Sequence, residues 1–281
     1  MTTIAARAHT TSDLIEQPAG GAPPAHAQVA YTIASLINDH AQYAAMLASF
    51  RAGGFTAEDC EYLYIDNSQE NRSCAYRGLD AMLSAARGSI VILCHQDVRL
   101  LSDDRVSLSE RLAELSNRDK NWALAGNAGA IAPGRLAVRM TDPHGANQHT
   151  AVLPARVMSL DENFIVVQRA ARVGFSRNLS GFHFYGADIC LNAAMAGYTA
   201  YVIDFHLAHL SAGNKSSSFF EAQDAFVAKW SAALTPRWMQ TTCALVRLSS
   251  DTLGQIAGRI AARPLASLYR HRAQRDGAAR G

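Results

Sequence analysis

Short apolar runs and stretches with helical spacing alternate through the first half of the chain. Runs rich in β-branched and aromatic residues are typical of strands, and they cover residues 29–36, 61–66 and 89–94. Apolar residues at helical spacing predict helices over 43–50, 77–86 and 107–115, and residues 122–131 predict another strand. Because this alternation favours a parallel sheet covered by helices, we expect an α/β fold.

The pattern changes in the second half of the chain. Residues 134–170 show short alternating runs interrupted by proline and glycine, which favours a meander or an antiparallel edge. A helix over 188–196, ended by Gly197, and a strand over 198–204 are expected next. We therefore expect a smaller mixed or antiparallel region beside a mostly parallel sheet.

The two ends of the chain differ from its body. Residues 1–27 are rich in Ala, Thr, Gly and Pro, which predicts a flexible arm. Residues 241–281 carry apolar residues interleaved with arginines, and we expect a basic helical tail that Pro264 divides into two segments, with a disordered end. One domain over 28–240 lies between them. Such a tail can lie on an anionic membrane surface, or it can pack on the domain with a solvated basic end.

Charge and cysteine content narrow the class of protein. The formal net charge of the 281 residues is +2, but the chain from Arg247 onward carries +5, so the remainder carries −3. An acidic body does not favour nucleic-acid binding, which depends on basic surface. The sequence has no apolar run long enough to span a membrane and no secretory signal at its start, and its five cysteines form no C-x-x-C pair. We expect a cytoplasmic protein, with peripheral contact at the inner face of the cell membrane through the tail.

Polar and ionisable residues follow the expected strands where each strand ends. They are Asn38-Asp39-His40, Asp66-Asn67-Ser68, His95-Gln96-Asp97 and Asp204. Ligands of open α/β sheets bind beyond the carboxyl ends of the strands. The sequence lacks the glycine-rich dinucleotide and phosphate loops and the G-x-S-x-G serine elbow. A rim of carboxylates instead suits Mg²⁺ or Mn²⁺ held together with substrate phosphates.

One carboxylate stands out in the stretch "GFHFYGADIC", residues 181–190. Asp188 follows a cluster of aromatic residues, and burial of a lone carboxylate is costly unless another group pairs with it or uses it. Two interpretations remain open for Asp188. It can act as a general base, or it can cap the helix that ends at Gly197.

Five motifs occur in the order seen in family-two-like glycosyltransferases of GT-A fold, over roughly residues 28–230. They are "YIDNS" (64–68), "HQDV" (95–98), "MSLDENFIVVQR" (158–169), "GFHFYGADICLNAAMAGYTAYVID" (181–204) and "HLSAG" (209–213). The sequence most resembles the bacterial "glycosyltransferase-like family" branch, in which His-Gln-Asp replaces the usual Asp-x-Asp.

The resemblance implies an inverting transferase that moves one sugar from a nucleotide-diphosphate donor to a glycan or lipid-linked acceptor. It implies that Asp188 is the catalytic base and that Asp97 and His209 ligate Mn²⁺ or Mg²⁺. The implied donor contacts are Asn38, Asp66, Asn67, His95, Gln96, Asp97 and Lys215. The implied acceptor contacts are Asp161, Phe182, His183, Phe184 and Tyr185.

Two other functions remain open. A nucleotidyltransferase with a similar sheet would carry a basic, glycine-rich N-terminal signature such as G-x-G-T-R, which this sequence lacks. A non-catalytic relative that binds a nucleotide or a glycan is the other alternative, because His95 stands where the majority pattern has an aspartate.

Overall fold

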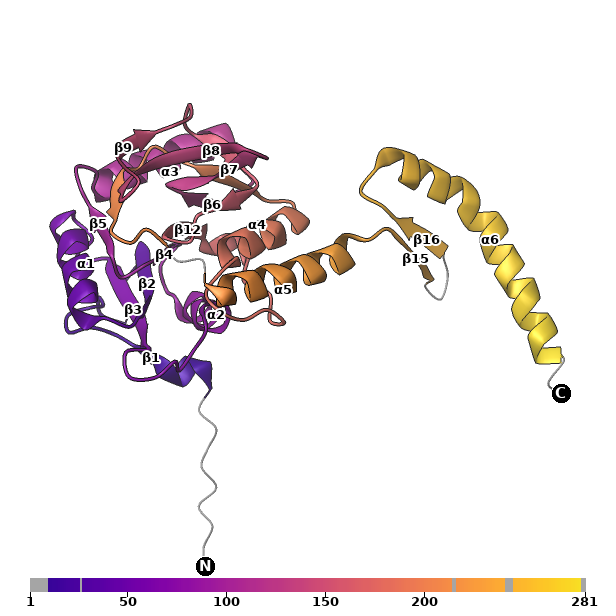
Figure 1. Cartoon of the computed structure of the whole chain (residues 1–281), viewed down its shortest axis with the longest axis horizontal. Helices are drawn as coiled ribbons and strands as arrows, with labels where there is room; N and C mark the ends of the chain where they lie inside the picture. The colour runs from indigo at the N-terminus through magenta and orange to yellow at the C-terminus, as the bar shows by residue number, and fades with distance from the viewer. Residues whose placement is uncertain (1–9, 26, 214–215, 241–244, 279–281) are drawn as a thin grey trace, which may run out of the picture. The chain divides into compact units, whose positions relative to one another are not determined.

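The computed structural model describes residues 10–25, 27–213, 216–240 and 245–278, and Figure 1 shows its elements. The chain divides into two compact units after Gln223. Each unit is described by itself.

The first unit is built around an eight-stranded sheet with the order β1-β3-β2-β4-β12-β6-β13-β10. Its strands are β1 (Ile15–Glu16), β2 (Tyr31–Ile37), β3 (Cys60–Asp66), β4 (Ile90–Cys94), β6 (Trp122–Gly126), β10 (Ala155–Val157), β12 (Phe164–Gln168) and β13 (Thr199–Val202). Strands β3, β2 and β4 are parallel to one another, as are β6 and β13. Strand β12 lies antiparallel between β4 and β6 and joins the two parallel groups.

Helices cover both faces of this sheet (Figure 1). They are α1 (His40–Ala52), α2 (Ala75–Ala85), α3 (Arg105–Arg118) and α4 (Tyr185–Met195). Apolar side chains of α1 and α3 share one core with alternate residues of β2, including Ile33 and Ile37. Helix α2 covers the other face, where Gly78 approaches Leu36 so closely that an added Cβ would lie 2.8 Å from its side chain.

A six-stranded second sheet has the order β11-β7-β8-β14-β5, and β9 also pairs with β8. Its strands are β5 (Val98–Leu100), β7 (Ala128–Ala132), β8 (Arg135–Asp142), β9 (Gly145–His149), β11 (Ser159–Leu160) and β14 (Leu207–His209). The single strand expected over 122–131 is therefore two strands in different sheets. Gly129 permits the close pairing of β7 with β11, because a Cβ there would lie 2.4 Å from the backbone oxygen of Ser159.

The mixed α/β fold and the antiparallel region expected from the sequence are confirmed.

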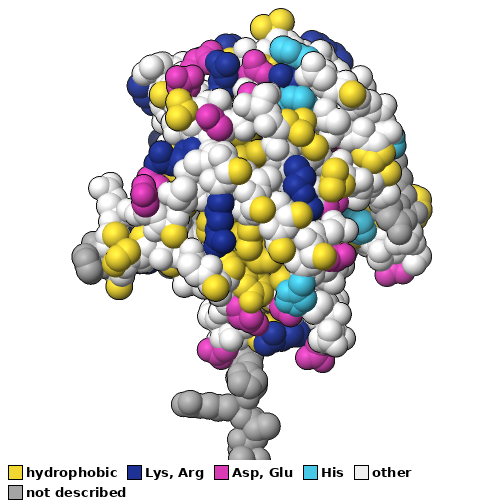
Figure 2. Space-filling model, turned by 90° about the vertical axis from the view of Figure 1, so that its left-hand side faces the viewer, with side chains coloured by type: hydrophobic (Ala, Val, Ile, Leu, Met, Phe, Trp, Pro, Cys, Tyr) yellow, Lys and Arg dark blue, Asp and Glu magenta, His cyan; other side chains and the backbone are white. Residues whose placement is uncertain are grey.

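The face shown in Figure 2 carries acidic and basic side chains that are interspersed, and neither charge forms a continuous patch there. A short 3₁₀ helix, η2 (Arg169–Ala171), follows β12.

Residues 10–25, which the sequence placed in a flexible arm, are hydrogen-bonded to other segments of the first unit. The 3₁₀ helix η1 (Thr11–Leu14) leads into β1, which pairs antiparallel with β3. The backbone oxygen of Gly21 accepts a hydrogen bond of 2.6 Å from Tyr62. The Arg87 guanidinium donates to the backbone oxygens of residues 23–25. Composition did not reveal these contacts, because all of them are made to residues far away in the chain.

The second unit holds most of helix α5 (Ser217–Leu234), the antiparallel hairpin of β15 (Arg237–Gln240) and β16 (Leu245–Leu248), and helix α6 (Thr252–Ala278). The predicted break at Pro264 is wrong, because α6 continues through it. Proline removes one backbone donor at a cost of about 3 kcal/mol, which a helix of this length can absorb. Among the described helices, none combines the length and apolar character needed to cross a membrane.

Candidate active site

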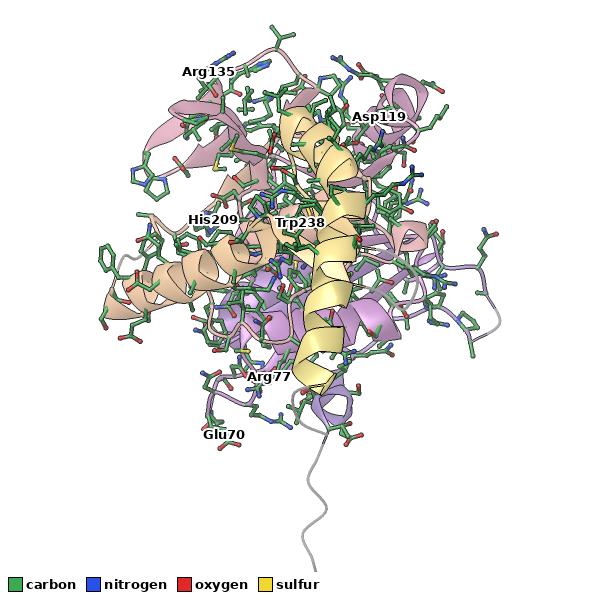
Figure 3. The ribbon with its side chains drawn as sticks, turned by 90° about the vertical axis from the view of Figure 1, so that its right-hand side faces the viewer. Glu70, Arg77, Asp119, Arg135, His209 and Trp238 are labelled. Atoms are coloured by element: carbon green, nitrogen blue, oxygen red, sulfur yellow. The ribbon has the colours of Figure 1, made fainter. Side chains whose placement is uncertain are left out.

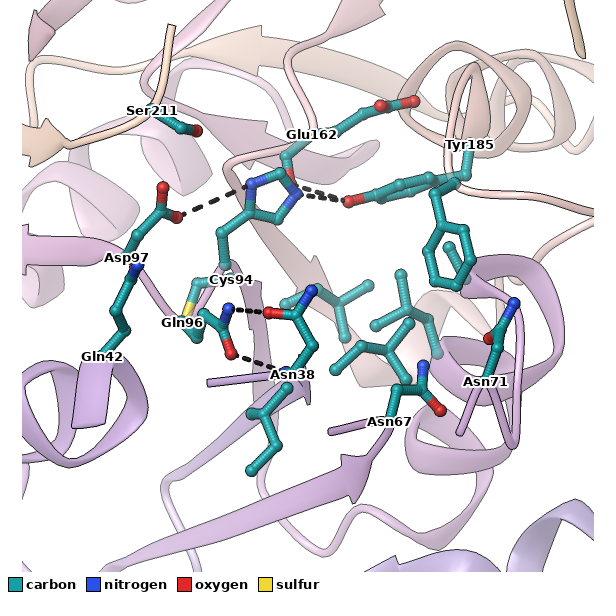
Figure 4. A pocket seen from close by; sticks show the side chains of 17 residues that line it. Asn38, Gln42, Asn67, Asn71, Cys94, Gln96, Asp97, Glu162, Tyr185 and Ser211 are labelled. Carbon is teal, nitrogen blue, oxygen red and sulfur yellow. Dashed lines mark hydrogen bonds and ion pairs between the residues drawn. The ribbon is translucent and has the colours of Figure 1, made fainter. Parts of the chain in front are cut away.

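A cavity of about 550 Å³ lies beyond the carboxyl ends of β2, β3 and β4, where the sequence predicted a ligand site (Figure 4). Its lining combines an apolar floor with many side-chain amides. The amide-bearing residues are Asn38, Gln42, Asn67, Asn71 and Gln96. Within the described part of the chain, no lysine or arginine lines this cavity.

The side chains of Asn38 and Gln96, which follow the neighbouring strands β2 and β4, are hydrogen-bonded to each other. The side-chain oxygen of Gln96 accepts hydrogen bonds from the backbone of Asn38 and Asp39, at 2.8 and 3.0 Å. The Gln96 amide nitrogen donates to the side-chain oxygen of Asn38. Asn67 makes a reciprocal pair with the backbone of Ser73, at 2.8 and 3.1 Å. The structure thus holds Asn38, Asn67 and Gln96 at this cavity, as the sequence predicted.

Three candidate metal ligands meet at the edge of the cavity. Single ligand atoms of His95, Asp97 and His209 all lie within 4.8 Å of one another. His95 follows β4, Asp97 precedes β5, and His209 ends β14, which pairs antiparallel with β5. An Asp97 carboxylate oxygen lies 3.5 Å from Nε2 of His209 and 4.0 Å from Nδ1 of His95. The pairing of β5 with β14 therefore explains how residues over a hundred positions apart converge.

The donor set fits a divalent cation. Burial, together with the neighbouring His209, lowers the pKa of His95, which keeps its imidazole neutral as a metal ligand must be. Nε2 of His95 is 2.8 Å from the Tyr185 hydroxyl, so Nδ1 is the atom directed at His209. Two imidazoles and one carboxylate can hold a first-row divalent ion, and the set by itself does not select Mn²⁺ over Zn²⁺ or Fe²⁺.

Glu162, which the sequence analysis did not select, also lines the cavity. It lies between β11 and β12 and accepts a hydrogen bond of 3.3 Å from the backbone of Gly186 in the first turn of α4. Burial, with the charge of Asp161 as a further cause, raises the pKa of Glu162 to about 8. A carboxyl group with this pKa can take up a proton near neutral pH. The signal in the sequence was an acidic pair directly before the apolar strand "FIVV".

Asp188 lies elsewhere, and it is fully buried. Its oxygens accept hydrogen bonds from the backbone and hydroxyl of Ser176, at 2.8 and 2.7 Å, and from the Asn192 amide at 3.2 Å. It lines neither this cavity nor a second one, of about 460 Å³, beside the candidate metal ligands. The capping alternative is wrong, since α4 begins at Tyr185 after Phe184, and the base role of Asp188 stays a prediction. Asp188 holds the segment around Ser176 against α4, because a buried carboxylate needs such donors.

The other sequence-predicted residues divide between the cavities and the surrounding scaffold. Phe182 and Tyr185 line the first cavity, and Asp161 lines a second one. His183 and Phe184 do not line either; their rings contact the ring of Phe219 instead, with centroids 5.4 and 5.0 Å apart.

Asp66 is not among the residues lining the first cavity. Its oxygens accept from the Ser68 backbone at 2.7 Å and face Nε2 of His40 at 3.0 Å. Burial by itself raises the pKa of Asp66, but these two neighbours more than offset it and lower the pKa overall. Lys215 lies outside the described residues.

Comparison with known proteins identifies one curated relative. The "ATP synthase subunits region ORF 6" protein of Fuscovulum blasticum is 36% identical over 211 residues, which cover 71% of this chain and 83% of the relative. The chain belongs to the family of this protein. The name of the relative states no activity, and no protein-family model matches the sequence.

Several solved structures share part of the fold. They include the mannosyltransferase PcManGT from Pyrobaculum calidifontis with GDP-Man and Mn²⁺ (15% identity, 70% of this chain, TM-score 0.45), TarS from S. aureus with UDP-GlcNAc (10%, 66%, 0.47), and GalNAc-T7 with UDP, GalNAc and Mn²⁺ (8%, 72%, 0.48). The chain spans 61%, 60% and 48% of these structures respectively. At these TM-scores the likeness carries no functional conclusion, so function must come from the site.

Proposed function

We propose that this protein is a metal-dependent glycosyltransferase that moves a sugar from a nucleotide-diphosphate donor to an acceptor hydroxyl, with inversion. One observation carries the proposal. A His-Asp-His ligand set and a partly buried glutamate, which the Tyr185 hydroxyl links through His95, lie at a cavity lined by amides, beyond the carboxyl ends of parallel strands.

The cavity suits the nucleoside part of such a donor. Side-chain amides offer both donors and acceptors to a base and a ribose, and an apolar floor that includes Leu36 and Leu79 accommodates a flat ring. Among the described residues that line this cavity there is no lysine or arginine. His95, Asp97 and His209 would hold a divalent cation that balances the charge of the diphosphate.

The acceptor hydroxyl needs a base to remove its proton during a single displacement. Glu162 suits this role because it lines the cavity and its raised pKa strengthens it as a base. Its hydrogen bond from Gly186 fixes its orientation, and Gly186 can carry no side chain, since a Cβ there would lie 2.4 Å from the backbone oxygen of Leu160. We therefore assign the base role to Glu162, in place of Asp188.

The tail would place this activity at a membrane. Helix α6 carries exposed Leu253, Ile260 and Leu268, with Arg259 and Arg263 among the positive charges of the tail. Helices with apolar residues and several arginines bind anionic lipid surfaces. We propose peripheral binding of α6 to such a surface, which would bring the site near lipid-linked glycans on the cytoplasmic face.

Donor hydrolysis is the direct test. Purified full-length protein is incubated with UDP-, GDP- and dTDP-sugars, with and without Mn²⁺, and release of the nucleoside diphosphate is measured. We expect one donor class to be hydrolysed slowly, and only with the metal. Binding of a sugar nucleotide without any hydrolysis or transfer would identify a non-catalytic binding protein instead. Release of pyrophosphate from a nucleoside triphosphate would identify a nucleotidyltransferase.

A further inference from the structure

A second cavity, of about 460 Å³, adjoins the first at the candidate metal ligands. Ser211 lines both cavities, and His209 lines the second. Asp161 lines the second cavity while its neighbour Glu162 lines the first. A molecule in the second cavity therefore reaches the place where the proposed base and the proposed metal site meet.

Strand β8 forms one wall of this cavity with alternate residues. Leu136, Val138, Met140 and Asp142 all line it, as a strand with a two-residue period allows. The intervening residues serve the fold, since Ala137 is fully buried and Arg139 forms a 2.6 Å ion pair with Asp204. Leu136 is nevertheless 60% exposed. Leu136 and Val138 thus face an open cavity, whereas Met140, which also lines it, is buried.

The strand register gives the cavity a polar end and an apolar end. Strand β14 runs parallel to β8 with Ala208 beside Thr141, which places His209 next to Asp142 at the polar end. At the other end Leu136 pairs with Ala130, whose backbone oxygen accepts a hydrogen bond of 2.8 Å from Met158. Figure 3 shows this separation, with Arg135, the neighbour of Leu136, at the top of the view and His209 below it.

Hydrogen bonds fix the turn that closes the polar end. Asp142 accepts from the backbone of His144 at 2.8 Å and of Gly145 at 3.0 Å, and from the Gln148 amide at 2.7 Å. Nε2 of His144 lies 3.3 Å from the backbone oxygen of Ala212. The wall next to His209 is therefore held in place from two sides, whereas the apolar end carries the exposed side chains of Leu136 and Met158.

We infer that the second cavity binds the acceptor of the transferase, and that this acceptor is an amphiphile. Its hydroxyl-bearing polar head would lie near His209 and Asp161, and its apolar chain or aglycone would lie along Leu136 and Val138. This inference rests on the proposed function. A lipid-linked sugar and a free hydrophobic glycoside share the required chemistry.

The binding test compares hexyl and methyl glycosides of the same sugar, below micelle-forming concentrations, with nucleoside diphosphate and Mn²⁺ present. Glucosides, galactosides, mannosides and N-acetylglucosaminides are titrated against the full chain by calorimetry and thermal shift. Burial of the added methylenes should lower the Kd of at least one hexyl glycoside by at least ~10-fold relative to its methyl partner. Equal affinities for every pair, or no binding of any hexyl glycoside, would overturn the inference.

A matched pair of variants locates the binding. The double variant Leu136→Gln/Val138→Thr should lose at least ~10-fold of the hexyl preference, while its melting temperature without ligand stays within a few degrees of the parent. Val106→Gln, at an exposed position of α3, is the control and should keep the full preference. An undiminished preference in the double variant would place the amphiphile elsewhere.

Two further measurements are informative. One distinguishes a lipid-linked acceptor from a free glycoside, and the other distinguishes failure of the proposed function from failure of the acceptor inference. A polyprenyl-linked sugar with a lower KM than the hexyl glycoside identifies a lipid-linked acceptor, and the reverse order identifies a free glycoside; either order supports the amphiphile. Failure of every sugar nucleotide to be hydrolysed or transferred counts against the proposed function. Normal donor hydrolysis with equal affinity for methyl and hexyl glycosides counts against the acceptor inference alone.

Discussion

Asp188 belongs to the first turn of α4 and Glu162 contacts the backbone of that turn, but the surroundings of the two acids differ. Asp188 has no exposed surface and accepts hydrogen bonds from Ser176 and Asn192. Glu162 is partly exposed and lines the cavity, and backbone N–H groups at the start of α4 lie against its carboxylate, with Gly186 donating at 3.3 Å. A fully buried carboxylate with backbone and side-chain donors stabilises a fold, whereas one at a cavity whose pKa is raised can exchange a proton. The comparison teaches that the hydrogen-bond partners of an acid, more than its neighbours in the sequence, separate the two roles.

The largest expected effect comes from Glu162→Gln. We predict a loss of sugar transfer of roughly 10²- to 10⁴-fold, because the amide cannot remove the acceptor proton. Donor binding should be retained, since the amides and the metal ligands are unchanged. Turnover and calorimetric titration of nucleoside diphosphate with Mn²⁺ measure the two quantities. Near-normal transfer by this variant would return the base role to another acid, with Asp161 the next candidate.

Asp97→Asn should weaken the binding of metal and donor, whereas Glu162→Gln should slow the transfer step. Loss of the carboxylate from the ligand set should weaken Mn²⁺ binding by at least ~10²-fold, more than the loss typical of an outer-shell partner. Binding of the nucleoside diphosphate should fall with it, since no described lysine or arginine lines the cavity. Calorimetry with and without Mn²⁺ is the measurement. Unchanged metal affinity would remove Asp97 from the site.

Substitution of Asp188 should lower the stability of the fold and leave sugar transfer largely unchanged. Asp188→Ala leaves the backbone amide and hydroxyl of Ser176 without their acceptor, which should lower the free energy of unfolding by roughly 1–3 kcal/mol. Asp188→Asn should cost less, because its amide oxygen still accepts one of these bonds. Transfer per folded molecule should stay within about tenfold of the parent for the Asn variant. A loss of ~10²-fold or more with an unchanged melting temperature would make Asp188 the base after all.

The pH dependence tests Glu162 a second way. The base must be ionised, so kcat/KM should rise with pH up to an apparent pKa near 8, and Glu162→Gln should remove that rise. The raised pKa also means that the folded state binds more protons than the unfolded state between about pH 4.5 and 8. The melting temperature should therefore fall as pH rises across this window, and the Gln variant should show a smaller fall. An identical pH profile for both proteins would contradict the assignment.

The smallest effect is expected for the tail. Arg259→Glu/Arg263→Glu reverses two charges of α6, and each basic residue near an anionic surface contributes about 1 kcal/mol to binding. Co-sedimentation with phosphatidylserine-containing vesicles at low salt should therefore drop several-fold or more, while donor hydrolysis stays unchanged. Vesicles of neutral lipid are the control. Equal sedimentation of both proteins would favour packing of the tail on protein.

The sequence by itself determined most strands and helices of the first unit and the place of the first cavity. Local periodicity decides which residues form an element, and the carboxyl ends of parallel strands must share one edge, so Asn38, Asn67 and Asp97 could be located in advance. His95 and Asp97 follow one strand directly, which made them candidates before any tertiary contact was known.

Only the tertiary structure decided which acid faces the cavity. Glu162 meets Gly186 across 24 positions and Asp188 meets Ser176 across 12, and neither contact leaves a periodic signal in the sequence. The antiparallel insertion of β12, the pairing of residues 10–25 with β3, and the amphipathic second cavity likewise depend on contacts between distant segments. Packing of such segments sets the burial and hydrogen bonding of each side chain, and these determine whether a carboxylate supports the fold or faces a ligand.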